Sequence, residues 1–173
     1  GSELSQHLQE RGWPFLVDNE REKTLSIRIH GNAFLLPPSG ANGHLYHEVA
    51  LETAFQIEEI DKRWIHFDTV MPEGDSRQFR GAVQLLDRRG LSVVSDIDDT
   101  IKLSNVLDKE ELLANTFLRD FQTTPGMAER YRQWEAEGAA FHYVTGSPWQ
   151  LYPALAEFLV TGGFPRGSFA MRD

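Results

Sequence analysis

Two aspartates, Asp96 and Asp98, stand one residue apart directly after a short apolar segment, residues 91–95. Such a segment is typical of a buried strand, so its end would place both carboxylates at the mouth of a sheet. Open α/β sheets bind their ligands there, outside the carboxyl ends of the strands. Clustered acids are costly to bury alone, and they commonly hold a cation. Carboxylate oxygens suit a hard ion such as Mg²⁺ or Ca²⁺.

The spacing after Asp96 decides between these two ions. A calcium-binding EF-hand loop that began at Asp96 would need glycine at its sixth position and glutamate at its twelfth. Those positions hold Ile101 and Leu107. The pattern excludes an EF-hand and leaves Mg²⁺, which takes one or two carboxylates together with water and phosphate oxygens. The alternative is that the acids only close a turn and neutralise nearby arginines.

A second buried strand is predicted over residues 139–144, and it ends at Thr145, Gly146 and Ser147. Ser147 is a suitable N-cap, and Pro148 suits the first position of a helix that would follow. A strand, a short polar turn and a helix N-terminus together form an anion site, because backbone N–H groups and hydroxyls point at the bound group. The alternative is an ordinary capped helix.

Acids at one strand end and an anion site at another suit phosphoryl transfer through an aspartyl-phosphate. One carboxylate would act as the covalent nucleophile, and the acid two residues away would protonate the leaving oxygen and then activate water. Thr145 and the adjacent amides would hold the phosphoryl oxygens. Mg²⁺ would reduce the repulsion between the nucleophile and the phosphate.

The stretch Asp96-Ile97-Asp98-Asp99-Thr100 matches the first motif of the haloacid dehalogenase superfamily, Asp-x-Asp-x-Thr, and Thr145 matches the second. The stretches SDIDDTIK, NTF, PGM and FHYVTGSPWQLYP resemble the catalytic domain of the actin-patch-protein phosphatidate phosphatases, relatives of the lipins, over roughly residues 79–173. This resemblance implies that Asp96 is the nucleophile and Asp98 the general acid and base. It also implies that Asp96 and the Asp98 backbone hold Mg²⁺, and that Thr145, Gly146 and Ser147 bind the phosphoryl group.

The function implied by this resemblance is a Mg²⁺-dependent phosphatase, with phosphatidate as substrate and diacylglycerol as product. One feature departs from the superfamily pattern, which places a lysine and a further acid after the second motif. The four lysines of this chain, Lys23, Lys62, Lys102 and Lys109, all precede Thr145. We therefore expect a chain truncated before motifs three and four, whose parent protein is an enzyme. The alternative is a non-catalytic phospholipid- or protein-binding module that keeps the fold.

Composition narrows the possible partners. The chain of 173 residues carries a net charge of −9, and it lacks the basic run on which nucleic-acid binding depends. An acidic protein also gains no electrostatic attraction to an anionic bilayer, so phosphatidate at a membrane surface is named on the resemblance alone. No segment approaches the roughly 20 apolar residues of a transmembrane helix. We expect a cytoplasmic protein that acts peripherally at membranes.

The elements around the motifs predict an α/β fold in two parts. Residues 1–88 are predicted to form a β-rich domain, a small antiparallel β-sandwich with a short helix over residues 3–11 before it. Residues 89–173 are predicted to form a partial Rossmann-like parallel sheet of the haloacid dehalogenase type. The expected strands are 24–30, 45–55, 64–70 and 79–85 in the first part, and 91–95 and 139–144 in the second. The expected helices of the second part begin near residues 108, 125 and 148.

Overall fold

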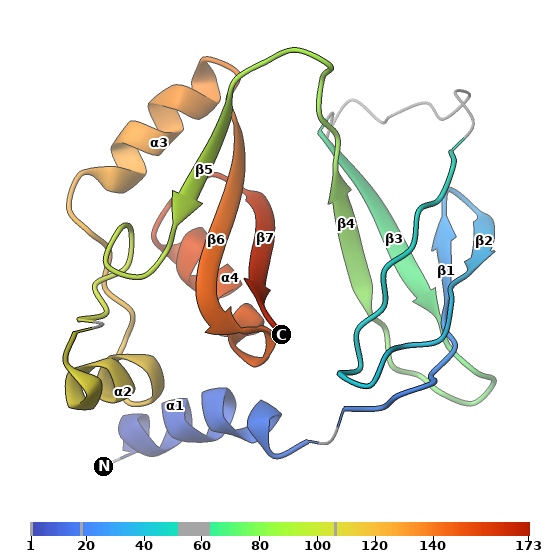
Figure 1. Ribbon diagram of the computed structural model, residues 1–173, viewed down its shortest axis with the longest axis horizontal. Helices are drawn as coiled ribbons and strands as arrows, with labels where there is room; N and C mark the ends of the chain where they lie inside the picture. Colours follow the sequence, from blue (N-terminus) through green and yellow to red (C-terminus); the bar gives the residue numbers. More distant parts are fainter. Residues whose placement is uncertain (1, 18, 52–62, 106) are drawn as a thin grey trace. The chain divides into compact units, whose positions relative to one another are not determined.

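The computed structural model describes residues 2–17, 19–51, 63–105 and 107–173. The chain forms two compact units: Asn19–Asp87 is one, and Gly1–Asp18 together with Arg88–Asp173 is the other. Each unit contains its own sheet (Figure 1), antiparallel in the first and parallel in the second. The predicted mixed α/β fold, with an antiparallel sheet before a parallel one, is confirmed. The functional division at residue 88 stays a prediction.

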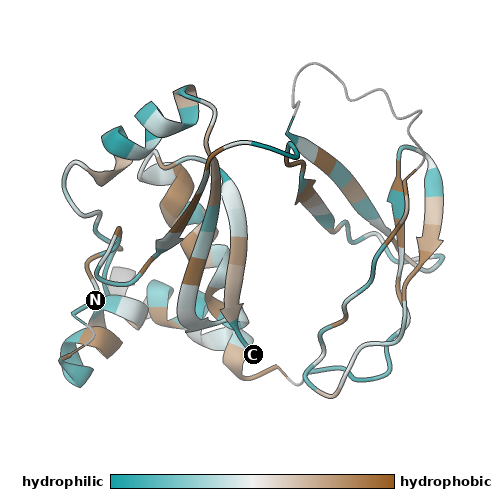
Figure 2. Ribbon diagram, turned by 45° about the horizontal axis from the view of Figure 1, so that its top comes forward, coloured by the Kyte–Doolittle hydropathy of each residue, from teal (hydrophilic) through white to brown (hydrophobic). Residues whose placement is uncertain are grey.

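The unit Asn19–Asp87 contains one antiparallel sheet of four strands in the order β2-β1-β3-β4. These strands are β1 (Ser26–Ile29), β2 (Asn32–Leu35), β3 (Trp64–Val70) and β4 (Arg80–Gln84). Apolar and polar residues alternate along β3 (Figure 2), as expected of a strand with one buried face. His30 and Gly31 both have positive φ, which is the conformation of the two-residue turn that joins tightly paired antiparallel strands such as β1 and β2.

The prediction of this unit was right for three strands and wrong for one. Residues 45–51 form no strand, and the rest of the expected strand 45–55 lies outside the described residues. Strand β2 was missed because its four residues are too few for a clear alternation. Among residues 19–51 and 63–87, the strands form a single sheet, and the second layer of a sandwich is not found there.

The second unit is built on a parallel sheet in the order β5-β6-β7. Its strands are β5 (Ser92–Asp96), β6 (Ala140–Pro148) and β7 (Gly167–Arg172), and its helices are α2 (Lys109–Phe117), α3 (Met127–Ala136) and α4 (Tyr152–Thr161). Asp96 pairs with Val144 in the register of β5 and β6. The two strand ends that carry the predicted motifs therefore meet at the same edge, because β5 and β6 run parallel.

The core of this unit lies between the sheet and its helices. Phe141 and Tyr143 point from β6 into this core, and Leu155 of α4 and Tyr131 of α3 pack there. Asp108 begins α2 by accepting hydrogen bonds from the backbone N–H groups of residues 110 and 111, the expected N-cap geometry. This buried framework fixes the strand ends on which the site is built.

The N-terminal helix α1 (Ser2–Gly12) is followed by a 3₁₀ turn, Trp13–Phe15. A helix was expected here, but as a lead into the β-rich part. It instead belongs to the unit of the parallel sheet. The ring of Phe15 meets that of Phe117 in α2 edge to face, with centroids 5.8 Å apart. Residues far from the motif strands in sequence therefore contribute to the unit that contains them.

Candidate active site

The loop after β5 is fixed by two isoleucines, Ile97 between the motif aspartates and Ile101 directly after the motif. Ile97 and Ile101 are completely buried. The carbonyl of Ile97 accepts hydrogen bonds from the N–H groups of Ile101 and Lys102, which turns the chain back within five residues. Because Ile97 points into the core, its neighbours Asp96 and Asp98 are held at the strand end. The apolar residue between the two acids of the motif thus anchors the loop in the core, while the acids remain available for chemistry.

Asp99 closes this loop from the other side. Its φ of 57° lies in the left-handed region, which aspartate tolerates better than most residues. Its Oδ1 accepts hydrogen bonds from the backbone N–H groups of Ser104 and Asn105, both at 2.7 Å. Asn115 of α2 donates to the carbonyl of Ser104 at 3.2 Å. The loop is therefore tied both to itself and to the helix that follows it.

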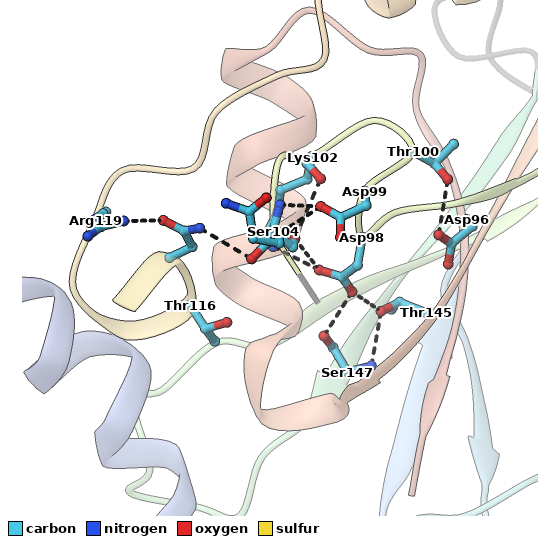
Figure 3. Close-up of polar contacts among 12 residues, drawn as sticks. Asp96, Asp98, Asp99, Thr100, Lys102, Ser104, Thr116, Arg119, Thr145 and Ser147 are labelled. Carbon is cyan, nitrogen blue, oxygen red and sulfur yellow. Dashed lines mark hydrogen bonds and ion pairs between the residues drawn. The ribbon is translucent and has the colours of Figure 1, made fainter. Parts of the chain in front are cut away.

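Asp98 is the centre of a polar network (Figure 3). Its Oδ1 accepts from Lys102 Nζ at 2.8 Å and from Ser104 Oγ at 2.7 Å. Its Oδ2 accepts from Thr145 Oγ1 at 2.8 Å and from Ser147 Oγ at 3.3 Å. Lys102 also donates to Ser104. Four donors from two strand ends therefore converge on one carboxylate.

This environment sets the charge of Asp98. Burial raises the pKa of its carboxyl, but the hydrogen bonds from Lys102, Ser104 and Thr145 and the lysine charge together lower the pKa below its usual value. The Lys102 side chain is only 3% exposed and that of Asp98 17% exposed, so the pair is largely withdrawn from water. Asp98 is accordingly ionised at neutral pH, balanced by a buried ammonium.

Asp96 differs from Asp98 in its exposure and in the hydrogen bonds that its carboxylate accepts. It is the last residue of β5 and is exposed. Its Oδ2 accepts a hydrogen bond from Thr100 Oγ1 at 3.1 Å, a contact between the first and last residues of the motif. The two aspartates therefore divide into an accessible carboxylate and a constrained one.

Thr145, Gly146 and Ser147 lie beside Asp98, as predicted, but not at a helix N-terminus. Strand β6 continues through Pro148, with an irregularity in its pairing between Val144 and Pro148, and a 3₁₀ turn (Trp149–Leu151) precedes α4. The prediction of Ser147 as an N-cap is therefore wrong. Helix propensity at Ser-Pro was outweighed by the continued pairing of β6 with β7. The backbone N–H of Ser147 instead donates to Thr145 Oγ1 at 3.0 Å.

Gly146 has no structural requirement for glycine within the described chain. A Cβ placed on it would meet no atom within 4 Å, and its φ is not in the left-handed region. The space above this residue is therefore open. Thr145, in contrast, is buried. The three residues thus provide two hydroxyls already in use and one backbone position that a ligand could approach closely.

Sequence reasoning missed Lys102 and Ser104. Lys102 was considered only as one of the lysines that precede Thr145, whereas the superfamily pattern has its lysine after that residue. It is nevertheless close to the first motif, as the last residue of the stretch SDIDDTIK. A burial signal was available, because Ile101 must lie in the core and its neighbours are thereby drawn close to it. The pairing with Asp98, four residues away, depends on the loop conformation and could not be deduced from spacing alone.

The described residues partly fit a Mg²⁺ site. Asp96 presents an exposed carboxylate, a suitable oxygen ligand. The carboxylate of Asp98 is engaged by four donors, so the backbone carbonyl is the oxygen that this residue could offer. Within the described ranges, no group of three or more His, Asp or Glu side chains is gathered closely enough to hold a metal.

A family model matches the part of the chain that forms this site. Residues 91–173 match the family model of phosphatidate phosphatase APP1, catalytic domain. The resemblance predicted from the motifs is thereby confirmed for this segment. It contains both aspartates, Lys102 and the Thr145–Ser147 turn, whereas α1 and the antiparallel sheet lie outside it.

One relative matches about half of the chain. An uncharacterized protein of Schizosaccharomyces pombe is 35% identical over 92 residues, which is 51% of this chain and 15% of that protein. The chain therefore spans a small fraction of the relative's length. None of the described helices is long and apolar enough to cross a bilayer.

Proposed function

We propose that this protein is a phosphatidate phosphatase of the haloacid dehalogenase type, which works through an aspartyl-phosphate on Asp96. The observation that carries the proposal is the different environment of the two motif aspartates, one exposed and one held by hydrogen bonds. Asp96 is exposed and has one weak hydroxyl contact, as a nucleophile requires. Asp98 is held beside it by a buried lysine and three hydroxyls.

In the first step, an Asp96 carboxylate oxygen attacks phosphorus and the bond from phosphorus to the ester oxygen breaks. Asp98 takes up a proton from solvent as the substrate binds and gives it to the leaving alkoxide, which departs as the alcohol, diacylglycerol for a phosphatidate substrate. In the second step, Asp98 takes a proton from water as that water attacks phosphorus. The phosphorus–oxygen bond to Asp96 breaks, which releases phosphate, restores the Asp96 carboxylate and leaves Asp98 protonated for the next leaving group.

Thr145 and Ser147 change partners in this scheme. Their hydroxyls donate to Asp98 Oδ2. A phosphoryl group above Gly146 competes for these donors, which releases Oδ2 to face the leaving oxygen. The same exchange removes two of the contacts that favour the ionised form of Asp98, so a proton is held there more readily. Phosphate binding and proton transfer are thereby linked through one carboxylate oxygen.

Mg²⁺ would be held by the Asp96 carboxylate and the Asp98 carbonyl, and its charge would offset the repulsion between Asp96 and a phosphate dianion. The remaining ligands would come from water, substrate and groups outside the described residues. The charge of the Asp98 carboxylate is balanced by Lys102, a buried cation.

The proposal is tested by phosphate release from the complete protein that carries these residues. Phosphatidate vesicles and a soluble aryl phosphate are compared, each with Mg²⁺ and with EDTA. We expect Mg²⁺-dependent release that Asp96→Asn abolishes and that Asp87→Asn, an exposed aspartate in the antiparallel unit, leaves unchanged. Faster release from vesicles would support phosphatidate over other esters. Wild-type rates in Asp96→Asn would overturn the nucleophile assignment.

A second candidate function is a phospholipid- or protein-binding module without turnover. The observation that favours it is that four donors engage the Asp98 carboxylate. It predicts saturable vesicle binding that survives Asp96→Asn, with no phosphate released from either substrate.

A further inference from the structure

Arg11 is a buried arginine of α1, outside the segment that matches the phosphatase family. Its guanidinium Nη1 donates to the carbonyl of Thr116 at 3.0 Å and to the carbonyl of Arg119 at 2.7 Å. Thr116 is in the last turn of α2 and Arg119 lies two residues after its end, where a cation is favoured by the helix dipole and by the unpaired carbonyls of the last turn. The residue is only 9% exposed. Arg11 therefore fixes the end of α2 from a distant part of the chain.

The ring of Phe121 brings Arg11 close to the candidate active site. The guanidinium carbon of Arg11 lies 4.0 Å from the ring centroid, and Lys102 Nζ lies 4.9 Å from the same centroid. The face of an aromatic ring attracts cations, most strongly where water is excluded. Lys102 is almost fully buried, so this ring replaces water that its ammonium would otherwise bind. One phenylalanine thus stabilises both cations.

A second connection passes through α2 itself. Asn115 donates to the carbonyl of Ser104, and Ser104 donates to Asp98 Oδ1. Arg119, whose carbonyl accepts from Arg11, donates from its side chain to Asn115 Oδ1 at 3.0 Å. The last turn of α2 therefore connects Arg11 to the loop that carries Asp98.

We propose that Arg11 is a positioning residue for Lys102 and Asp98, which acts through the Phe121 ring and the last turn of α2. The inference rests on the proposed function, because Asp98 is the acid and base of that scheme. It extends the catalytic machinery beyond residues 91–173 to the N-terminal helix. It also predicts that residues 91–173 alone hold Lys102 less firmly than the longer chain.

A simple role in stability is the competing explanation, and the chain offers a control for it in a more exposed arginine, whose side chain is 48% exposed. Arg132 of α3 donates from Nη1 to the carbonyl of Gly163, just after α4, at 2.6 Å. It too is an arginine that binds a carbonyl beyond a helix C-terminus, but it contacts neither Phe121 nor the motif loop in any described interaction. Arg132→Gln therefore reports the loss of such a contact without the connection to Lys102.

The first test measures phosphatase kinetics of the complete protein with Arg11→Gln, Phe121→Leu and Phe121→Tyr. We expect Arg11→Gln and Phe121→Leu each to lower kcat by about tenfold, equal to about 1.4 kcal/mol of transition-state stabilisation. KM should change less than about twofold, because the substrate's phosphate contacts are intact. Phe121→Tyr keeps the aromatic face, so its kcat should stay near that of the wild type. Arg132→Gln should also leave kcat unchanged.

Non-additivity separates a shared connection from two independent defects. If Arg11 acts through Phe121, the double variant Arg11→Gln/Phe121→Leu should lose about 10- to 20-fold in kcat rather than about 100-fold. Full additivity together with equal kcat losses in Arg11→Gln and Arg132→Gln would overturn the proposal. So would an unchanged kcat in Arg11→Gln.

The second test does not depend on activity. The side-chain ammonium of Lys102 is observed by ¹⁵N-lysine NMR of the complete protein, with its resonance assigned through Lys102→Arg. We expect Arg11→Gln and Phe121→Leu to shift this resonance or lose it to faster exchange with water, and Arg132→Gln to leave it in place. If the protein shows no turnover but its Lys102 signal responds in this way, the proposed phosphatase function is refuted and the positioning role of Arg11 is supported. An unmoved signal in both variants would refute the positioning role whatever the activity.

If Arg11→Gln does not fold, Arg11→Lys and Phe121→Leu carry both tests. Lysine keeps the cation near the ring but cannot donate to two carbonyls in the fixed geometry of a guanidinium. We then expect an intermediate loss of kcat and a smaller shift of the Lys102 resonance. Wild-type values of both in Arg11→Lys and in Phe121→Leu would overturn the proposal.

Discussion

Replacing Lys102 by methionine tests how strongly the site depends on its buried ion pair. Methionine has a similar length and no charge, so it fills most of the same space. The substitution removes the donor 2.8 Å from Asp98 Oδ1 and the contact with Ser104. It leaves a carboxylate with 17% of its side chain exposed and without its counter-charge. The expected result is a loss of both stability and turnover.

The magnitude follows from what remains around Asp98. Removing one partner of a fully buried pair costs about 3–5 kcal/mol, because the other charge is left uncompensated. Here Ser104, Thr145 and Ser147 still donate to the carboxylate, and water reaches part of it. A lost hydrogen bond to a charged group is worth about 1.5–3 kcal/mol. We therefore expect Lys102→Met to lower the free energy of unfolding by about 2–3 kcal/mol.

This change in the free energy of unfolding is measured by hydrogen exchange at a series of urea concentrations. Peptides of β5 and β6 report on the unit of the parallel sheet separately from the antiparallel unit. The ion pair between Arg80 and Asp68 provides the control. Its atoms are also 2.8 Å apart, but its side chains are 77% and 58% exposed. Arg80→Met should cost less than about 1 kcal/mol in its own unit. A cost below about 0.5 kcal/mol for Lys102→Met would refute the reasoning that Asp98 depends on its buried counter-charge.

Three further outcomes are expected. Asp96→Asn should leave the free energy of unfolding unchanged or slightly higher, because it removes a charge from an acidic strand end, and a large loss by urea unfolding would contradict an exposed, nucleophilic role. Gly146→Ala should fold normally, since its Cβ meets no protein atom, but should raise KM for any phosphate ester; a normal KM would show that the phosphate lies elsewhere. Gly167→Ala is the contrasting control for stability, because its Cβ would come within 2.6 Å of the Phe141 carbonyl oxygen. Finally, the pKa of Asp98 is lower in the folded protein than in the unfolded chain, where it is about 4. Ionised Asp98 therefore stabilises the fold fully at pH values above about 4, and this stabilisation is lost as the pH falls through the pKa of the folded protein. In metal-free buffer, Asp98→Asn should therefore lose less stability than the wild type between pH 5 and pH 3, and parallel losses would contradict the assigned shift.

The sequence predicted those features that depend on local pattern. The apolar runs before Asp96 and Thr145 identified β5 and β6, and chain order with short connections made them parallel neighbours. The expected helix starts near residues 108 and 125 lie within two residues of the observed starts of α2 and α3, at Lys109 and Met127. The spacing of Asp96 and Asp98 was sufficient to expect two carboxylates at one strand end. Periodicity and turn chemistry are properties of consecutive residues, and they can be read without the fold.

Tertiary structure alone decided which groups surround those carboxylates. The extension of β6 to Pro148, against the Ser-Pro helix signal, depends on pairing with β7, a strand that ends at Arg172. The pairing of Lys102 with Asp98 depends on a loop held by two buried isoleucines. The contact of Arg11 with the end of α2 joins residues 105 positions apart. Such contacts arise when the core brings remote segments together, and a buried charge then takes whichever partner the packing provides. The sequence by itself determined the chemistry available at the strand ends, and the tertiary structure determined which of the two aspartates is exposed and which is held.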